Sequence, residues 1–317
     1  MNRILSPRSL AALAVCASAF APAPAHALGA AFTCSAVTYQ VVGAQLKIGS
    51  VDNNVLSYTN VGAAHTGSYN AGGYNTVDNF IYALSGSPAN LLKVASDGTV
   101  ESNAVTGVTT PHTFVAGDVS TDGQSLIAYN MNDDKVWSID LDTFVGTEIG
   151  SLATAMPPAD VGDFAIVTDG GESTAYGFDT ETGMLVYFDP TENPITVNVN
   201  PQVEIGAGGA KGAVWADSSG NLTVFVNATG DVYSVKNPSA VSPVVKKVAS
   251  GATAAGNDGM KCALAASAFT DPDESDEELA TTGVSPVALS LIGATSLALF
   301  AIGKAVRRTR RRDYPHA

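Results

Sequence analysis

The feature that most constrains the fold of this chain is an internal repeat of about 45 residues. Four segments, which begin near residues 75, 119, 166 and 215, share one order: a turn, a strand-like run, a second turn rich in Asn, Asp and Gly, and another strand-like run. The last run sets the register of the repeat, with spacings of 46, 45, 49 and 47 residues between its equivalent positions, which are Ile48, Val94, Ile139, Phe188 and Val235.

A period near 45 with several short strands per unit is typical of a propeller blade. β-branched and aromatic residues alternate with turn residues, and no long stretch has helical periodicity, so the chain is expected to be all-β. A single blade cannot bury both of its faces, and neighbouring blades must therefore stack. We predict a β-propeller of about five blades over residues 28–264, with six blades as the alternative and a solenoid or sandwich as competing architectures.

The N-terminus has the pattern of a secretory signal peptide. Arg3 and Arg8 precede an apolar run over residues 10–20, and small residues follow up to Ala25-His26-Ala27. A basic start, a short apolar segment and an A-x-A site predict export and cleavage between Ala27 and Leu28. Residues 1–27 are thus a predicted signal peptide, the alternative being an uncleaved anchor.

The C-terminus has the pattern of a membrane stop. Residues 284–303 carry no charge, and 20 apolar positions are enough for one helical crossing of the bilayer. A basic cluster after such a segment stays in the cytoplasm, so residues 304–317 are a predicted cytoplasmic tail. Its stop-transfer residues are Lys304, Arg307, Arg308, Arg310, Arg311 and Arg312.

Directly before the predicted transmembrane helix stands LATTG, formed by Leu279, Ala280, Thr281, Thr282 and Gly283. In this order of elements the pentapeptide resembles a Gram-positive cell-wall sorting signal, with Ala280 where the common form has proline, as in the variant read by sortases of actinobacteria. The resemblance implies cleavage of the Thr282–Gly283 bond by a sortase and transfer of the Thr282 carbonyl to an amine of the peptidoglycan. A simple tail-anchored membrane protein is the alternative.

Residues 265–278 include the run DPDESDEE and are a predicted disordered spacer, because like charges without apolar residues repel one another and stay solvated. Such a spacer would keep the pentapeptide accessible and hold the folded domain away from the membrane.

Two cysteines remain in the exported part, Cys34 and Cys262, one at each end of the repeats. An even pair outside the cell predicts a disulfide, here closing a loop of 228 residues. The first repeat lacks its preceding half, and the segment after Val248, with NDGMKCALA, is a candidate to supply it. A ring closed by strands from both ends would bring the two cysteines together, whereas a solenoid would keep them apart.

The runs YNAGGYNTVDNFIYAL, AGDVSTDG, GFDTETGMLVYFD and NDGMKC resemble a secreted actinobacterial propeller-like domain of undescribed function, over residues 32–264. More loosely, the chain is similar to lactonase-like and quinoprotein-like propellers. The resemblance implies the fold and export more than any activity.

The charge balance excludes nucleic acid as a partner. The full chain has a net charge of −14, but removal of both ends takes away eight of 16 basic residues and one of 30 acidic residues. The remaining eight lysines and 29 acids give −21, and no arginine is left. Such a segment would be repelled by phosphate backbones and anionic lipid.

The sequence offers no catalytic set. The exported part has two isolated histidines, His65 and His112, and no nucleophile elbow, phosphate-binding loop or zinc-spaced Cys/His cluster. Aspartates recur at turns, where they cap the backbone; the alternative is a carboxylate ring around the channel that binds Ca²⁺. These aspartates are Asp78, Asp122, Asp140, Asp169, Asp179 and Asp189. We therefore predict no catalytic residue, no metal site and no cofactor, Ca²⁺ being the one candidate.

The chain is thus expected to be a non-enzymatic binding or adhesion module on the surface of a Gram-positive cell, with an extracellular ligand that the sequence does not identify. Its tyrosines and tryptophans should form blade core, and some could line a carbohydrate- or peptide-binding face. The alternatives are a secreted hydrolase or oxidoreductase built on a propeller, and a structural envelope protein without a discrete ligand.

Overall fold

The computed structural model describes residues 27–108, 111–155, 159–206 and 209–269. The predicted signal peptide up to residue 26, the pentapeptide, the apolar segment 284–303 and the basic tail lie outside the described residues. Within the described part, no helix is long and apolar enough to cross a membrane.

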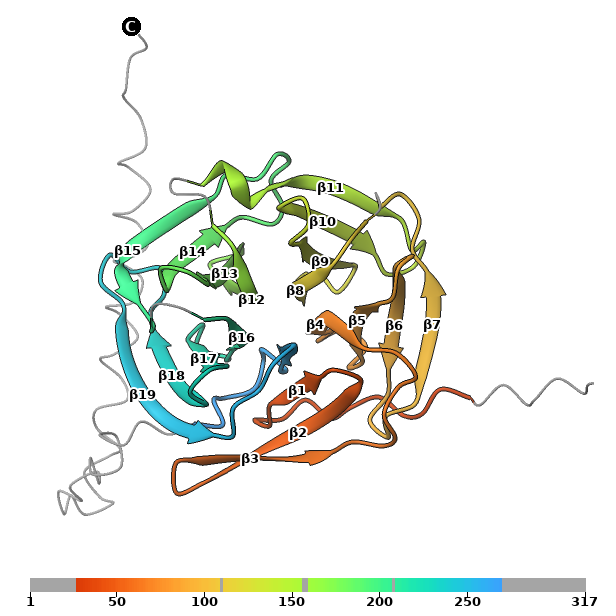
Figure 1. The fold of residues 1–317 in the computed structure, drawn as a ribbon, viewed down its shortest axis with the longest axis horizontal. Helices are drawn as coiled ribbons and strands as arrows, with labels where there is room; N and C mark the ends of the chain where they lie inside the picture. The colour runs from red at the N-terminus through yellow and green to blue at the C-terminus, as the bar shows by residue number, and fades with distance from the viewer. Residues whose placement is uncertain (1–26, 109–110, 156–158, 207–208, 270–317) are drawn as a thin grey trace, which may run out of the picture.

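In the described residues, twenty strands form a ring of five blades, each an antiparallel sheet of four strands (Figure 1). Three blades are separate sheets, and the other two are joined into one sheet of eight strands because their outermost strands pair in parallel at two positions, Ser250 with Val55 and Gly251 with Leu56. The prediction of an all-β propeller with five blades is confirmed, and the alternative of six is wrong.

The strands of each blade are given from the channel outward. Blade 1 consists of β20 (Asn257–Met260), β1 (Tyr39–Val42), β2 (Gln45–Asp52) and β3 (Val55–Asn60). Blade 2 consists of β4 (Tyr69–Tyr74), β5 (Ile81–Ser85), β6 (Asn90–Val94) and β7 (Val100–Ala104). Blade 3 consists of β8 (Phe114–Val119), β9 (Ser125–Asn130), β10 (Lys135–Asp140) and β11 (Gly146–Ser151), followed by the 3₁₀ helix η1 (Leu152–Thr154). Blade 4 consists of β12 (Val161–Asp169), β13 (Glu172–Asp179), β14 (Met184–Phe188) and β15 (Asn198–Glu204). Blade 5 consists of β16 (Lys211–Ala216), β17 (Leu222–Val226), β18 (Asp231–Lys236) and β19 (Val244–Gly251).

The register predicted from the repeat is confirmed. Each of the five equivalent positions lies on the third strand of its blade. Each is paired with a residue of the second strand of the same blade. The pairs are Ile48 with Tyr39, Val94 with Ile81, Ile139 with Leu126, Phe188 with Ala175, and Val235 with Leu222.

The ring closes through strands from both ends of the chain, as predicted. β20 pairs antiparallel with β1, from Tyr39 opposite Met260 to Val42 opposite Asn257, so the C-terminal segment supplies the innermost strand of blade 1. The disulfide between Cys34 and Cys262 is present, with 5.3 Å between the two Cα atoms. In blades 2–5 a hairpin turn joins the first strand to the second; in blade 1 the disulfide makes the covalent connection at this place.

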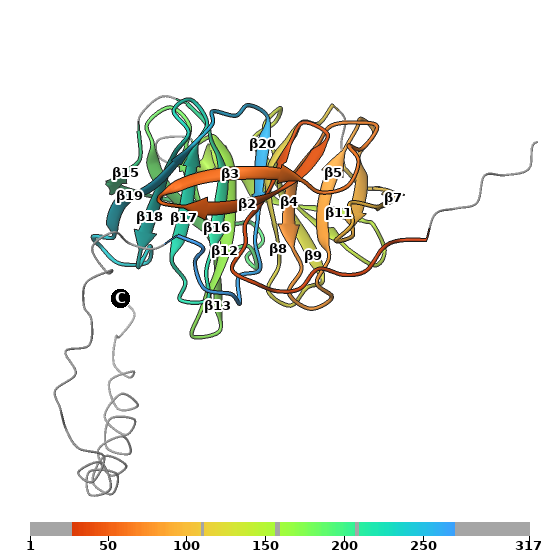
Figure 2. The same cartoon turned by 90° about the horizontal axis from the view of Figure 1, so that it is seen from below.

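The propeller has two faces, which we name by the direction of the innermost strands. These strands begin at face A, where the connections between blades and turns such as 131–134 lie. They end at face B, where turns such as 120–124 and 217–221 lie. In Figure 2 face B is the lower side, and the segments before β1 and after β20 run along it. Both ends of the described chain therefore lie at face B.

Residues 265–269 pack against the propeller, which corrects the predicted boundary. The Ser218 amide donates a hydrogen bond of 3.0 Å to the Ala265 carbonyl. The Phe269 ring is 7% exposed and stacks on Trp215, with 6.1 Å between the ring centres. The predicted spacer begins too early because the apolar Phe269 finds a partner that the local sequence does not show.

The core lies mainly in the layers between neighbouring blades. Between blades 3 and 4, for example, Tyr129, Phe164 and Phe188 are buried together. The prediction that most large aromatics form blade core is confirmed for Tyr69, Tyr74, Tyr82, Tyr129, Trp137, Tyr176 and Trp215, while Tyr187 and Tyr233 are partly buried at the edge of the core.

Candidate functional site

The innermost strands approach one another closely around the central channel. A Cβ added at Gly117 of β8 would lie 2.6 Å from the Ala71 carbonyl oxygen of β4. A Cβ at Gly259 of β20 would lie 2.8 Å from the Cβ of Ala213 in β16. Both distances are too short for a side chain, so glycine is required where one inner strand touches the next.

Three carboxyl groups link the inner strands, the fully buried Asp163 and Asp258 and the half-buried Asp118, and we call them the channel aspartates. One oxygen of Asp118 accepts a hydrogen bond of 2.8 Å from the Ile166 amide of the next blade. Asp258 accepts one from the Gly72 amide. These amides belong to the free edges of inner strands, which lack a neighbouring strand to pair with, so the carboxyl groups satisfy donors that would otherwise be buried without a partner.

Asp163 makes the largest number of these contacts. Its Oδ2 atom accepts hydrogen bonds from the Val214 amide at 2.7 Å and from the Gly259 amide at 3.1 Å, while its Oδ1 atom accepts one from the Phe164 amide at 2.7 Å. A single side chain on blade 4 thereby holds the inner strands of blades 5 and 1.

The channel aspartates lie in a setting that disfavours their charge. Burial raises the pKa of Asp118 to about 7, although its two backbone hydrogen bonds act in the opposite direction. Burial also raises the pKa values of Asp163 and Asp258 well above the ordinary range, and the neighbouring Asp258 carboxyl raises that of Asp163 further. The channel thus holds protons on carboxyl groups at a pH at which exposed carboxyl groups are ionised.

We expect the stability of the propeller to fall as the pH rises toward neutrality. An unfolded Asp118 titrates near pH 4 and the folded one near pH 7, so the folded state binds this proton more tightly. The contribution is fully present below about pH 4 and is lost by about pH 7, up to about 4 kcal/mol. Urea unfolding at pH 5 and pH 8 would measure it, and Asp118→Asn should reduce the difference. An equal difference in Asp118→Asn and in the exposed control Asp122→Asn would contradict this account.

At face A the channel opens into a cavity of about 310 Å³ that all five blades line. Three asparagines at this opening, Asn70, Asn227 and Asn257, form what we call the mouth amides. The Oδ1 atoms of all three, and the Nδ2 atom of Asn257, are buried without a hydrogen-bond partner among the described residues. Asn257 is only 2% exposed. Buried amides of this kind are normally paired, so the mouth has unused capacity to bind a polar group.

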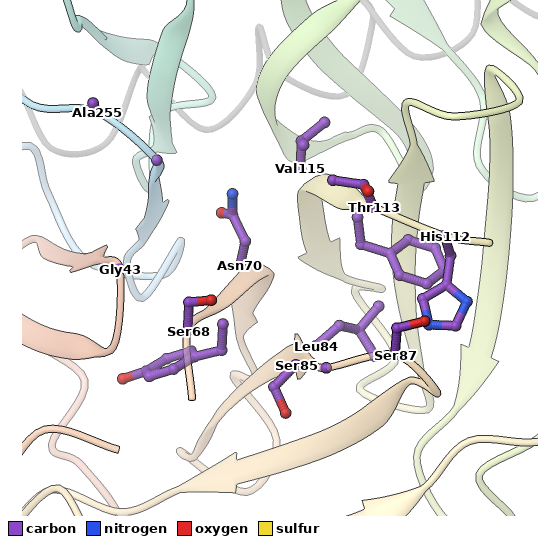
Figure 3. Close-up of a pocket in the computed structure, with 14 residues that line it drawn as sticks. Gly43, Ser68, Asn70, Leu84, Ser85, Ser87, His112, Thr113, Val115 and Ala255 are labelled. Carbon is purple, nitrogen blue, oxygen red and sulfur yellow. The ribbon is translucent and has the colours of Figure 1, made fainter. Parts of the chain in front are cut away.

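A second cavity of about 530 Å³ adjoins the mouth between blades 1, 2 and 3 (Figure 3). It shares Asn70, Val115 and Gly256 with the mouth, and we call the two together the face A groove. Figure 3 shows Asn70 extending into the open centre of this view. The cavity has a partly apolar lining with Tyr69, Leu84 and Phe114, and a set of hydroxyl groups from Ser68, Ser85, Ser87 and Thr113.

The face A groove carries little charge. None of the described residues that line the larger cavity is Asp, Glu, Lys or Arg. The ring of His112 lies against Phe114, with 5.5 Å between the ring centres. At the mouth, the Asp160 carboxylate is the one acidic group among the described lining residues, and it accepts hydrogen bonds from the hydroxyls of Tyr129 at 3.1 Å and Thr180 at 3.2 Å.

At face B a cavity of about 450 Å³ is lined by Asp118, Tyr74 and Lys261 among others. Burial lowers the pKa of Lys261 to about 8. Its ammonium group donates to three backbone carbonyls, those of Ala265 at 2.8 Å, Cys262 at 3.1 Å and Ala216 at 3.4 Å. Because these bonds use its three donors, Lys261 holds the C-terminal segment beside the disulfide.

The structure places five of the six turn aspartates as caps, whereas Asp169 is the last residue of β12 and pairs with Glu172 of β13. Asp122 accepts from the Gln124 amide at 3.1 Å, Asp140 from the Thr143 amide at 2.7 Å, and Asp189 from the Thr191 amide at 2.8 Å. Asp78 and Asp179 likewise accept from nearby turn amides. The channel carboxyl groups are a different set, which the sequence reasoning missed. The described residues contain no cluster of three or more His, Cys, Asp or Glu side chains arranged to hold a metal ion.

Comparison with solved structures finds distant likenesses only. One chain of a nidogen/laminin complex resembles this protein with 9% identity and a TM-score of 0.43, over 72% of this chain and 98% of the other. The structure of YjhT has 12% identity and a TM-score of 0.44, over 71% of this chain and 83% of the other. A catalytically inactive virginiamycin B lyase from Staphylococcus aureus, solved with quinupristin, has 9% identity and a TM-score of 0.42, over 69% of this chain and 72% of the other. These distant likenesses say nothing of activity or ligand. No curated protein matches the sequence.

A family model described as a repeat of unknown function, DUF6923, matches residues 32–264, the span over which the sequence resembles a secreted propeller-like domain. These residues comprise all five blades and the disulfide. The chain therefore belongs to the DUF6923 repeat family.

Proposed function

We propose that this protein is exported, is attached covalently to the cell wall of a Gram-positive bacterium through LATTG, and displays its propeller as a binding module. The observation that supports this proposal best is that both ends of the described chain lie at face B, while the face A groove lies at the opposite end of the channel. An attachment that follows Phe269 would leave the groove open toward the surroundings of the cell.

A binding role accounts for the polar groups better than an enzymatic role does. The channel aspartates accept backbone hydrogen bonds on inner strands, and Lys261 donates to backbone carbonyls, so these perturbed groups hold the ring together. Hydrolysis would need a nucleophile and a base in mutual contact, with a third group that orients the base. The face A groove instead offers unpaired amides and hydroxyls, which bind a ligand without reacting with it.

Replacing Thr282 with alanine is expected to block attachment to the wall and to leave export intact, because the sorting reaction transfers the Thr282 carbonyl. Cells that produce the wild type or the variant would be separated into medium, membrane and muramidase-released wall fractions, and the protein followed by immunoblot. The wild type should appear in the wall fraction and Thr282→Ala in the membrane fraction.

Thr270→Ala provides a matched control outside the pentapeptide and should behave like the wild type. Wild-type protein that stays in the membrane fraction, at the same level as Thr282→Ala, would refute covalent attachment.

A further inference from the structure

We propose that the face A groove binds a neutral saccharide and that the mouth amides are its polar anchors. This inference deepens the proposed binding role by naming the ligand class. It rests on the unpaired amide groups, on the convergence of two of them over Gly212, and on the uncharged, hydroxyl-rich lining of the adjoining cavity.

The mouth amides have hydrogen-bonding groups that the described chain leaves unused. An unpaired buried donor or acceptor costs about 1–3 kcal/mol, so such groups persist where something outside the chain satisfies them. Asn257 has an unpaired acceptor and an unpaired donor, while Asn70 and Asn227 each have an unpaired acceptor. A sugar hydroxyl both donates and accepts, and it can therefore satisfy either kind of group.

Two of these amides converge on one point. A Cβ built on Gly212 would meet the Oδ1 atom of Asn257 and the side-chain amide of Asn227. The space above Gly212 is thus bounded by polar atoms from two blades that make no hydrogen bond to each other. Asn70 approaches the same mouth from blade 2. Because the amides come from three blades around an opening, they suit a compact ring that carries hydroxyls in several directions.

The adjoining cavity can hold a second sugar unit. Ser68, Ser85, Ser87 and Thr113 provide hydroxyl partners for a sugar (Figure 3), while Tyr69 and Phe114 are largely buried and contribute only the apolar floor of the cavity. The lack of Asp, Glu, Lys and Arg among its described lining residues leaves no ion-pair partner for a charged ligand. The strongly negative exported part also repels anionic sugars, so a neutral sugar fits this lining better than an anionic one.

Calorimetric titration of the full chain tests this inference. The protein would be purified in a zwitterionic detergent, which has no sugar head group. The probes are neutral tetrasaccharides of glucose, mannose, galactose and N-acetylglucosamine, with tetragalacturonate as the anionic comparison. At least one neutral probe should bind with a Kd of about 1 mM or lower, and the anionic probe should not bind.

Asn70→Ala and Asn257→Ala should weaken binding at least about tenfold, because each removes a polar anchor that the sugar satisfies. The melting temperature of both variants should stay the same or rise, since neither change breaks a hydrogen bond within the described chain. The matched control is Asn198→Ala, an exposed asparagine on the outer strand of blade 4, which should bind like the wild type.

Failure of all four neutral probes to bind at about 10 mM would overturn the inference, as would equal binding of tetragalacturonate. A clear drop in the melting temperature of both variants would show that the amides support the fold through ordered water, and would overturn it too. Wall attachment is measured separately by fractionation. A wall-bound protein without affinity for sugar therefore refutes the ligand class alone, and a sugar-binding protein outside the wall refutes the attachment alone.

Discussion

Replacing Cys34 or Cys262 with serine is expected to lower the free energy of unfolding by about 3–5 kcal/mol. The disulfide closes a loop of 228 residues, and the entropy that it removes from the unfolded chain grows with loop length. It also takes the place of the hairpin turn that joins the first two strands in the other four blades. Without it, β20 is held to blade 1 by hydrogen bonds and packing alone, and the ring can open there.

Urea unfolding, followed by the fluorescence of Trp137 and Trp215, measures this loss. The two single variants, the double variant and the reduced wild type should all lose the same amount, because each breaks one covalent link. If none of these changes shifts the urea unfolding curve, the result would contradict closure of the ring by the disulfide.

Asp163→Ala is expected to cost about 3–5 kcal/mol of stability. The change leaves the Val214, Gly259 and Phe164 amides without their acceptor in a site where Asp163 is fully buried. Each unpaired buried amide costs about 1–3 kcal/mol, and the relief from burying a carboxyl group offsets part of the sum. Because Asp163 joins three blades, its loss should loosen the inner strands of blades 4, 5 and 1.

Urea unfolding gives the total loss, and hydrogen exchange locates it at the Val214 and Gly259 amides. The matched control is Asp122→Ala, which removes an exposed turn cap and should cost about 1 kcal/mol or less. Equal losses in the two variants, or unchanged exchange at both amides, would show that Asp163 does not hold the blades together.

Sequence periodicity was sufficient to predict the blades. Residues such as Ile139 and Phe188 face the core at the same position of every repeat, and burial at a fixed register imposes the spacing that identifies them. Closure was predictable for a related reason. The first repeat lacks a strand, and the chain end carries a strand-like segment beside a cysteine.

The channel aspartates could not be found in this way. Asp258 stands in Asn257-Asp258-Gly259, a sequence that usually indicates a turn, yet these residues form the innermost strand of blade 1. Asp118 and Asp163 each follow a glycine, and this recurrence was a usable signal: both glycines lie on inner strands where neighbours come close. Their partners are 48 and 51 residues away, at distances along the chain that local patterns do not reach.

The mouth amides could not be predicted from the sequence either. Asn70, Asn227 and Asn257 belong to three blades, and only closure of the ring brings them to one opening. Single asparagines near strand ends resemble turn residues, which are common throughout this chain. Their unpaired atoms become visible only when every neighbour is in place.

Mass spectrometry of the C-terminal peptide, from protein released from native cells by muramidase, tests the central claim most directly. We predict a peptide that ends at Thr282 and carries an amine derived from the cell wall. This result would make the propeller a displayed module attached on its face B side. A peptide that continues through Gly283 into the apolar segment would contradict the claim, since the protein would then be tethered to the membrane without sortase cleavage.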